Sequence, residues 1–367
     1  MDRVVKGQGK NGVTEGRTAQ LDSCLLPPST ERCAGFTEIP ISSPVHVIAQ
    51  VPPSYIAGGD LRGHIHLISN SPGEAIRRLD LLQPQGPVID IVSLGSDTLV
   101  AQYQRPPIVA WTRQLDDSWA PTRLPPFTLV EGVLSQGSDS SATAALRSGG
   151  ILAMSKDQPN EPLSIRILCV HKSFVATYAN NDGSFFAAEK GGTIAFFEDS
   201  QSEAPSRVWR SNDTSPVLQI SNVDRNTCII AKASGVIEMC GPSKISAEKP
   251  VEILRPSNGQ FLGITKSGSV LLTEAQGLLL FEWSGGTFLP HQLLTGIRPV
   301  SFALLPGGAL FLGGFRGEAE IWRRGEAGWD VRPLKPHQEM ITTCMYSQAT
   351  GLVTASYDKT IRTWAQL

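Results

Sequence analysis

Short apolar runs separated by glycine and proline turns extend along most of this chain, and they recur with a regular period. The clearest copy is GLVTASYDKTIRTW, residues 351–364, where two alternating strands flank a tight turn that contains Lys359. The position of Lys359 recurs at Gly317, Gly277, Gly235, Gly191, Gly149, Pro106 and Gly63. Successive positions lie 40 to 44 residues apart, which indicates internal repeats.

The columns on either side of this turn keep the same character from copy to copy. Five residues after the turn a large apolar residue recurs, and Trp364 is its last copy. Four residues before the turn the residue is usually small, as at Gly313 and Ala355. Only Gln102 and Glu282 depart from these columns. A small column beside a large apolar one is expected where sheets pack face to face and one backbone approaches another closely.

Each repeat contains four strand candidates separated by glycine or proline turns. In the seventh repeat they are Val300–Leu305, Leu310–Gly314, Glu318–Trp322 and Trp329–Leu334. Four strands in about 40–45 residues are typical of one blade of a β-propeller. The sequence therefore predicts an all-β propeller of eight four-stranded blades. The alternative is seven blades, with residues 44–82 or 128–170 as an appendage.

The last repeat is incomplete, because only AQL follows Trp364. We expect the segment near AGFTEIP, residues 34–40, to supply the missing outer strand. Such an exchange closes the ring and removes exposed sheet edges. Residues 1–32 then form a polar N-terminal tail, disordered or peripherally docked, and residues 33–367 form the propeller.

The final repeat resembles the WD-repeat family of β-propellers. In residues 336–364, His337, Ser356, Asp358 and Trp364 stand at the positions of that family's structural tetrad, in which hydrogen bonds link a turn to a strand. The resemblance implies a structural and not a catalytic role for these four residues. It also implies a non-enzymatic platform for peptides or partner subunits, whose usual docking surface is the narrower top face of the ring.

Composition and charge favour an intracellular binding protein. Charged residues are 18% of the chain and the net charge is −2, which argues against wholesale coating of nucleic acid. The six cysteines form no close pair or cluster, so a disulfide framework or structural zinc site is not expected. The sequence has no apolar signal region at its N-terminus and no run long enough to cross a bilayer. We expect a soluble protein of the cytoplasm or nucleus without membrane insertion.

Cations recur at the turn between the second and third strands, which should lie on the top face. The candidate partner-binding residues are Arg62, Arg105, Arg147, Lys190 and Arg316. Because arginine forks bind carboxylates and phosphates, these residues form a predicted basic arc that attracts acidic or phosphorylated segments. The alternative interpretation is a set of ordinary solvated cations.

Two hypotheses follow for function. The first is a scaffold that holds one or more partner proteins in an intracellular complex. The second is a reader of acidic, phosphorylated or nucleic-acid ligands through the basic arc, with nucleic acid the least favoured ligand. An ionic reader should weaken steeply with added salt, whereas an apolar docking face should weaken only slightly.

The sequence contains no catalytic motif that would favour an enzyme. It has no P-loop, no G-x-G-x-x-G before a helix, no H-E-x-x-H and no G-x-S-x-G. Acids are sparse in the inner-strand segments, with Asp90 in PVIDIVS the main exception, so an enzyme with a channel site is the less favoured alternative. His64 and His66 in GHIHLIS alternate along a strand and share one face. Without a carboxylate or cysteine nearby to complete a ligand set, we expect no metal and no cofactor.

Overall fold

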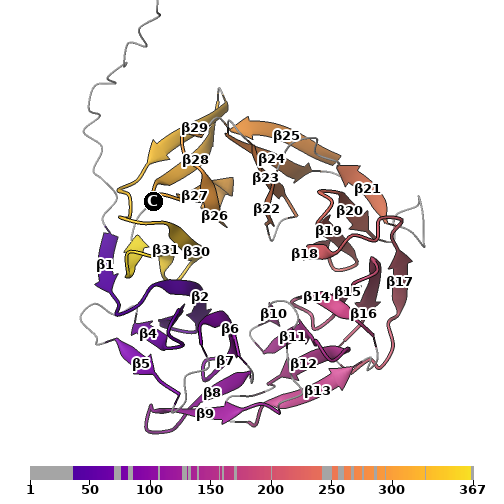
Figure 1. Ribbon diagram of the computed structural model, residues 1–367, viewed down its shortest axis with the longest axis horizontal. Coiled ribbons are helices and arrows are strands. Elements are labelled where there is room, and N and C mark those ends of the chain that lie inside the picture. The colour runs from indigo at the N-terminus through magenta and orange to yellow at the C-terminus, as the bar shows by residue number, and fades with distance from the viewer. Residues whose placement is uncertain are drawn as a thin grey trace, which may run out of the picture. The chain divides into compact units, whose positions relative to one another are not determined.

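The computed structural model describes residues 36–69, 76–81, 86–105, 108–125, 130, 134–138, 140–156, 158, 161–168, 172–199, 201–241, 250–254, 260–265, 268–274, 277–284, 287–293, 295–326 and 328–364. These residues belong to the second of two units of the chain, Ala34–Leu367. Within this unit, eight four-stranded antiparallel sheets stand around a ring (Figure 1). The predicted all-β fold with eight blades is confirmed, and the seven-bladed alternative is wrong. The predicted polar tail, residues 1–32, lies outside the described residues.

In the first seven blades the four strands follow chain order from the central channel to the rim. Blade one contains β2 (Val45–Val51), β3 (Tyr55–Asp60), β4 (Ile65–Ser69) and β5 (Arg77–Leu79). Blade two contains β6 (Val88–Leu94), β7 (Thr98–Tyr103), β8 (Val109–Arg113) and β9 (Trp119–Arg123). Blade three contains β10 (Ser135–Ser138), β11 (Ser141–Ala145), β12 (Ile151–Ser155) and β13 (Ser164–Leu168). Blade four contains β14 (Phe174–Ala179), β15 (Phe185–Glu189), β16 (Thr193–Phe197) and β17 (Arg207–Arg210).

The second half of the ring repeats this order. Blade five contains β18 (Val217–Asp224), β19 (Thr227–Lys232), β20 (Ile237–Cys240) and β21 (Val251–Leu254). Blade six contains β22 (Gln260–Ile264), β23 (Val270–Glu274), β24 (Gly277–Ser284) and β25 (Thr287–Leu293). Blade seven contains β26 (Pro299–Leu304), the 3-10 turn η1 (Pro306–Gly308), β27 (Leu310–Gly314), β28 (Ala319–Gly325) and β29 (Gly328–Pro333). Blade eight contains β30 (Ile341–Ser347), β31 (Gly351–Ser356), β32 (Thr360–Trp364) and β1 (Phe36–Pro40).

The ring closes through the N-terminal segment, as predicted. Strand β1 pairs antiparallel with β32, and Phe36 lies opposite Trp364 in the register. Arg362 anchors this junction: its side chain donates to the Glu38 carboxylate at 2.9 Å and to the carbonyl oxygens of Lys335 and Pro336. Arg362 is only 3% exposed, so the guanidinium is buried with its charge paired. The missing outer strand of the last blade is thus supplied from the other end of the propeller.

The small column of the repeat marks the close approach of neighbouring blades. A Cβ atom added to Gly59 of β3 would lie 2.6 Å from the Val88 side chain at the start of the next blade. A Cβ atom on Gly313 of β27 would lie 2.8 Å from Ile341 in the same way. In blades one and seven the second strand therefore lies directly against the first residue of the following blade, and a side chain larger than glycine would clash there.

The register corrects the repeat alignment in two blades. In blade four Ala188 pairs with Ile194, so the glycine with positive φ at the turn is Gly192 and not Gly191. In blade six Glu274 pairs directly with Gly277, so Gly277 begins β24 instead of occupying the turn. A fixed period cannot detect such local shifts.

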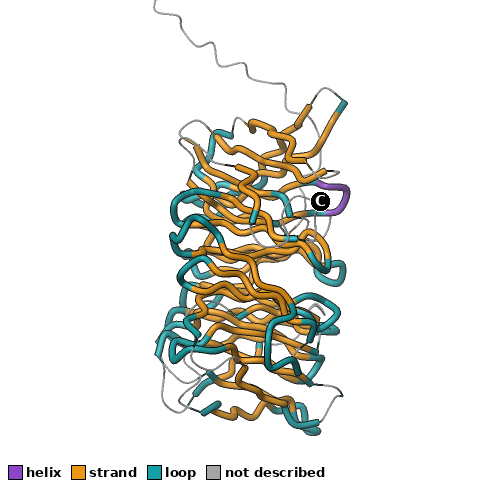
Figure 2. The backbone as a smooth tube through the Cα atoms, turned by 90° about the vertical axis from the view of Figure 1, so that its right-hand side faces the viewer, coloured by secondary structure: helices purple, strands orange, loops and turns teal. Residues whose placement is uncertain are grey.

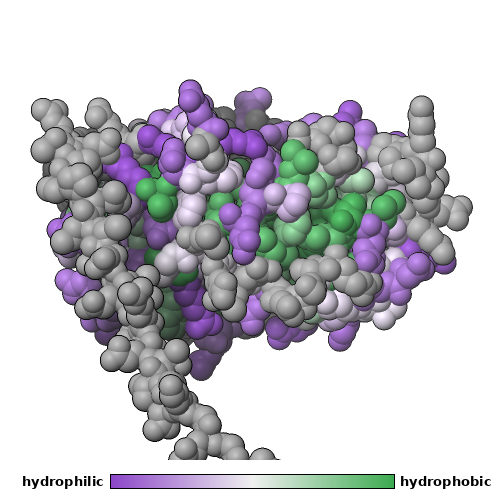
Figure 3. All heavy atoms as spheres, turned by 90° about the horizontal axis from the view of Figure 1, so that it is seen from above, coloured by the Kyte–Doolittle hydropathy of each residue, from purple (hydrophilic) through white to green (hydrophobic). Residues whose placement is uncertain are grey.

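The antiparallel order divides the loops between two faces of the ring, as the side view shows (Figure 2). One face carries the turns between second and third strands together with the connections that lead into each inner strand; we call it the turn face. Seen from the side of β25 and β29, the rim carries apolar side chains among polar ones (Figure 3). Leu289 of β25 and Val331 of β29 are 44% and 49% exposed. No helix in the described residues has the length and apolarity to span a membrane.

Candidate docking face

All five predicted partner-binding cations are exposed on the turn face, in blades one, two, three, four and seven. Arg62, Arg105 and Arg316 occupy the central position of their turns, as the registers of the flanking strands define it. Arg147 and Lys190 lie one residue earlier in theirs. The structure thus brings the five residues to one face but at two different turn positions. Whether they bind a partner stays a prediction.

Most of these cations have no carboxylate partner within the described part of the chain. Arg62, Arg105, Lys190 and Arg316 make no ion pair with a described residue. The nearby Glu318 carboxylate is instead held by the main-chain N–H of Arg316 at 2.8 Å. These four side chains therefore remain free of a described carboxylate, while the Glu318 oxygen is bound within its own turn.

Another carboxylate of the turn face, Asp213, is engaged in the same way. It accepts a hydrogen bond from the main-chain N–H of Ser215 at 2.8 Å and another from the Ser234 hydroxyl. Burial alone would raise the pKa of Asp213, but these hydrogen bonds outweigh it and lower the pKa to about 2. Its oxygens are therefore occupied by donors within the turns and are not directed at the exposed arginines.

An exposed aromatic side chain adds an apolar contact point to the turn face. Phe315, in the turn between β27 and β28, exposes 49% of its surface. The guanidinium of Arg298 lies over its ring, with the carbon of the guanidinium 5.2 Å from the ring centroid. Arg316 follows in the chain and is also exposed. Sequence reasoning identified Arg316 but missed Phe315 and Arg298, because the connection before β26 meets this turn only in the folded ring.

The predicted tetrad of blade eight forms a buried hydrogen-bond chain through a residue that the sequence analysis did not select. His337 Nδ1 lies 2.9 Å from Asp358 Oδ2, and His337 Nε2 lies 2.9 Å from Thr354 Oγ1. Trp364 Nε1 donates to the same hydroxyl at 3.1 Å. Ser356 stands outside this chain, since its hydroxyl donates to the carbonyl oxygen of Glu339. Thr354 is therefore the hydroxyl that links the imidazole to the indole.

The protonation of His337 follows from its surroundings. Burial lowers the pKa of His337, and the nearby positive charge of Arg362 lowers it further. A neutral imidazole can donate from Nδ1 to Asp358 and accept at Nε2 from the Thr354 hydroxyl. Every polar side-chain atom of this hydrogen-bond chain then has a suitable partner, and all four residues belong to blade eight. Such an arrangement stabilises the blade and offers no group that faces a substrate.

The inner strands surround a channel with a cavity of about 880 Å³. Its wall is largely apolar, and Leu218, which lines it, is 55% exposed. Among the described lining residues Asp90 is the one carboxylate, and none is a histidine. Burial raises the pKa of Asp90 to about 7, and its oxygens accept hydrogen bonds from the N–H groups of Ile91 and Leu134. Asp90 is thus a buried carboxyl held by two main-chain donors at the channel wall.

The histidines of blade one have a carboxylate neighbour that the sequence analysis overlooked. Asp60, at the end of β3, lies within hydrogen-bond distance of both His64 and His66. The expectation that no carboxylate completes this set is therefore wrong. The sequence spacing contained this information, because Asp60 precedes His64 by four residues and His66 by six, and residues so spaced can meet across a tight hairpin turn.

Solved structures provide the comparison for this architecture. The crystal structure of Saccharomyces cerevisiae Sqt1 aligns with a TM-score of 0.65 and 12% sequence identity, over 90% of this chain and 98% of that one. U3-55K aligns with a TM-score of 0.54 and 14% identity, over 90% and 98% of the two chains. The WD40 repeats of RRP9 align with a TM-score of 0.54 and 14% identity, over 89% and 96%. The chain has the fold of a WD-repeat β-propeller.

The likeness to WD-repeat propellers is one of architecture, since the aligned sequences share few identical residues. Neither the known family profiles nor the curated protein sequences give a match to this chain. In blade eight His337 contacts Asp358, and His337 and Trp364 share the Thr354 hydroxyl. That these residues are the structural tetrad of the family stays a prediction.

Proposed function

We propose that this WD-repeat-like propeller is a non-enzymatic protein-interaction platform, which holds a partner protein on its turn face in a cytoplasmic or nuclear complex. The observation that carries the proposal is Phe315, which exposes 49% of its surface beside two arginines. Aromatic and arginine side chains are the residue types that contribute most to binding at protein interfaces. An exposed aromatic ring on a turn can pack against an apolar side chain of a partner.

The turn that carries Phe315 is rigid before any partner arrives. The N–H of Phe315 donates to the carbonyl oxygen of Arg298 at 2.9 Å, and the N–H of Gly314 donates to that of Glu318 at 2.7 Å. Gly317 takes the positive φ of +87° that the turn requires. Because the turn is already ordered, binding loses little conformational entropy there.

The surroundings of Phe315 favour a particular chemistry in the partner. An apolar side chain of the partner would pack on the phenyl ring, and flanking carboxylates would pair with Arg298 and Arg316. Acidic residues next to an aromatic or aliphatic anchor are therefore the expected features of the bound segment. Such a segment agrees with the predicted basic arc, although the Phe315 contact does not depend on the arc.

A pair of matched variants tests this proposal. Phe315→Ser removes the anchor from the turn face, and Val331→Ser removes an apolar side chain of equal exposure from the rim strand β29. Each full-length variant is immobilised, and the proteins captured from a cell lysate are quantified by mass spectrometry. We expect a specific partner that Phe315→Ser loses and Val331→Ser retains. Equal capture of all proteins by both variants would overturn the assignment of the turn face.

The second candidate function is a reader of acidic or phosphorylated segments, and the unpaired state of the turn cations favours it. Arg62, Arg105, Lys190 and Arg316 are exposed without an ion pair among the described residues. A ligand that bridges several of them gains charge-assisted hydrogen bonds, and each added contact makes binding more sensitive to salt. This candidate differs from the first in its reliance on charge instead of on Phe315.

Charge reversal separates the two candidates. One variant changes the turn-face residues Arg62, Arg105, Arg147 and Arg316 to Glu. Its control makes the same change in net charge on exposed residues of the third and fourth strands of their blades, namely Arg123, Arg207, Arg210 and Arg323. We expect a labelled phosphoserine peptide rich in Glu to bind wild type and control with equal affinity. Its affinity for both should fall at high salt, and it should not bind the turn-face variant. Equal binding by both variants would exclude the reader and leave the scaffold proposal standing.

A further inference from the structure

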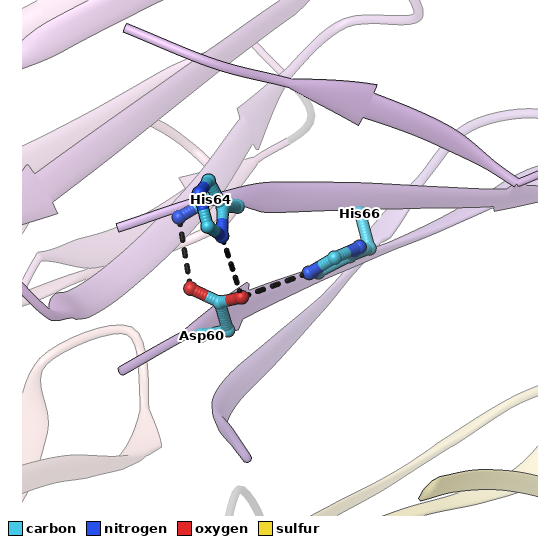
Figure 4. Close-up of side chains that lie close together, drawn as sticks. All are labelled: Asp60, His64 and His66. Carbon is cyan, nitrogen blue, oxygen red and sulfur yellow. Dashed lines mark hydrogen bonds and ion pairs between the residues drawn. The ribbon is translucent and has the colours of Figure 1, made fainter. Parts of the chain in front are cut away.

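Three potential metal ligands meet on one hairpin of blade one. Asp60 ends β3, and its main-chain N–H donates to the carbonyl oxygen of His64 at 3.0 Å, so these two residues lie opposite each other. His66 lies two residues further along β4, on the same face as His64. The tight turn therefore directs one carboxylate and two imidazoles toward a single point (Figure 4).

The ligand atoms already lie near the distances that a metal ion requires. Asp60 Oδ2 is 2.9 Å from His64 Nδ1 and 3.0 Å from His66 Nε2, and all three atoms lie within 4.8 Å of one another. In a tetrahedral site with ligand bonds of about 2.0–2.1 Å, neighbouring ligand atoms lie roughly 3.3 Å apart. The two oxygen–nitrogen distances are thus a few tenths of an ångström shorter than in such a site, and small rotations of the imidazoles would lengthen them.

The carboxylate is held in a fixed orientation by the main chain. Its Oδ1 accepts hydrogen bonds from the main-chain N–H groups of Arg62 and His64, both at 2.9 Å. Oδ2 faces the two imidazoles, while the two main-chain hydrogen bonds hold Oδ1 in place.

A second carboxylate stands behind one of the imidazoles. Asp80 Oδ1 lies 3.9 Å from His64 Nε2, and Asp80 Oδ2 is held by Arg78 at 2.8 Å. When a metal takes Nδ1, the His64 proton resides on Nε2, where a nearby carboxylate stabilises it. Ligating histidines in metalloproteins are usually oriented by an outer carboxylate of this kind.

Burial and access also suit an ion. The side chains of Asp60 and His66 are buried, whereas that of His64 is 22% exposed and borders solvent. The pair in blade eight provides a contrast, because there one imidazole meets one carboxylate and its second nitrogen is bonded to Thr354. In blade one, by contrast, two imidazole nitrogens contact the same carboxylate oxygen, Asp60 Oδ2.

We propose that Asp60, His64 and His66 form a binding site for one divalent transition-metal ion of the zinc class. Two imidazole nitrogens and one carboxylate oxygen are the donor set that Zn²⁺ and Co²⁺ accept. Three protein ligands leave the fourth position open on the side of His64, for water or for a side chain of another molecule. The site rests on these contacts alone and does not depend on the proposed docking of a partner.

Cobalt titration of the untagged full-length chain tests the site. After treatment with EDTA and desalting, CoCl₂ is added and the ligand-field spectrum is recorded, followed by displacement with ZnCl₂. We expect one ion per chain, a tetrahedral spectrum without the charge-transfer band of a cysteine thiolate, and loss of affinity by about 100-fold or more in His64→Gln and Asp60→Asn. Asp80→Asn should weaken binding about 10-fold, because it removes only the outer carboxylate.

Controls keep the result interpretable. His46→Gln removes an exposed histidine in β2 outside the cluster and should bind cobalt like wild type. Calorimetry verifies that the His64 and Asp60 variants melt cooperatively, so that a loss of binding is not a loss of the fold. Equal affinity of wild type and His64→Gln, a thiolate band, or no saturable binding in the folded wild type would each overturn the proposal.

Discussion

Replacing Thr354 with Val isolates the contribution of the hydrogen-bond chain in blade eight. Thr354 is fully buried in β31, and its hydroxyl connects His337 Nε2 at 2.9 Å to Trp364 Nε1 at 3.1 Å. Valine has nearly the same shape, so the substitution leaves no cavity. It removes the hydroxyl and so leaves the buried Trp364 N–H and the buried His337 Nε2 without these hydrogen bonds.

The expected magnitude follows from these two orphaned groups. Each unsatisfied buried polar group costs about 1–3 kcal/mol, and the added methyl group offsets part of this, so we expect a destabilisation of about 2–5 kcal/mol. A propeller of roughly 330 residues has an unfolding entropy of about 0.7 kcal/mol per kelvin. The melting temperature should therefore fall by about 3–7 °C.

The assay is differential scanning calorimetry of Thr354→Val beside a matched Thr143→Val. Thr143 is also buried, 4% exposed in β11, but its hydroxyl has no hydrogen-bond partner among the described residues. Removing that hydroxyl should leave the melting temperature unchanged or raise it slightly. If the two variants melt at the same temperature, the hydrogen bonds through Thr354 contribute nothing to stability, and the reasoning is refuted.

Two further predictions concern the same region of the ring. Gly317→Ala should destabilise by about 2–4 kcal/mol, because its Cβ would press on the carbonyl oxygens of His337 and Glu339 at a positive φ. Gly183→Ala shares that φ but meets no atom within 4 Å, so thermal melting should show a loss of only about 1 kcal/mol, and similar losses would refute the steric argument. The folded-state pKa of His337 lies below its ordinary value of 6.5, so its contribution to stability is present above that pH and is lost as the pH falls. Melting temperatures measured from pH 7.5 to 5 should fall more steeply for wild type and for His46→Gln than for His337→Gln; an equal slope in all three would contradict this.

Much of the architecture was predictable because the same pattern of strands and turns recurs many times along the sequence. The period near forty-two residues, the glycine turns and the small column together predicted four-stranded blades and favoured eight over seven, and the eight sheets confirm that number. The incomplete last repeat likewise indicated that β1 completes blade eight. In blade seven the predicted strands agree with β26 to β29 to within a few residues at each end.

The errors arose where one blade departs from the common pattern. Gly191 and Gly192 are adjacent glycines, and only the pairing of Ala188 with Ile194 shows which of them adopts the positive φ. Glu282 interrupted an apolar column, yet in the structure its carboxylate bonds His291 at 3.2 Å and Arg324 of the next blade at 3.1 Å. Ring packing decides such positions, and a single repeat does not contain that information.

The sequence by itself determined what depends on local periodicity: the blades, the turns, and the placement of five cations on one face. The tertiary structure alone decided which side chains meet across elements. Thr354 joins His337 because the connection into β30 folds over β31, and Phe315 meets Arg298 because two separate loops converge at the turn face. Asp60 reaches two imidazoles because the hairpin of blade one closes tightly. These contacts depend on directions in space, which a linear pattern of hydrophobic and polar residues does not encode.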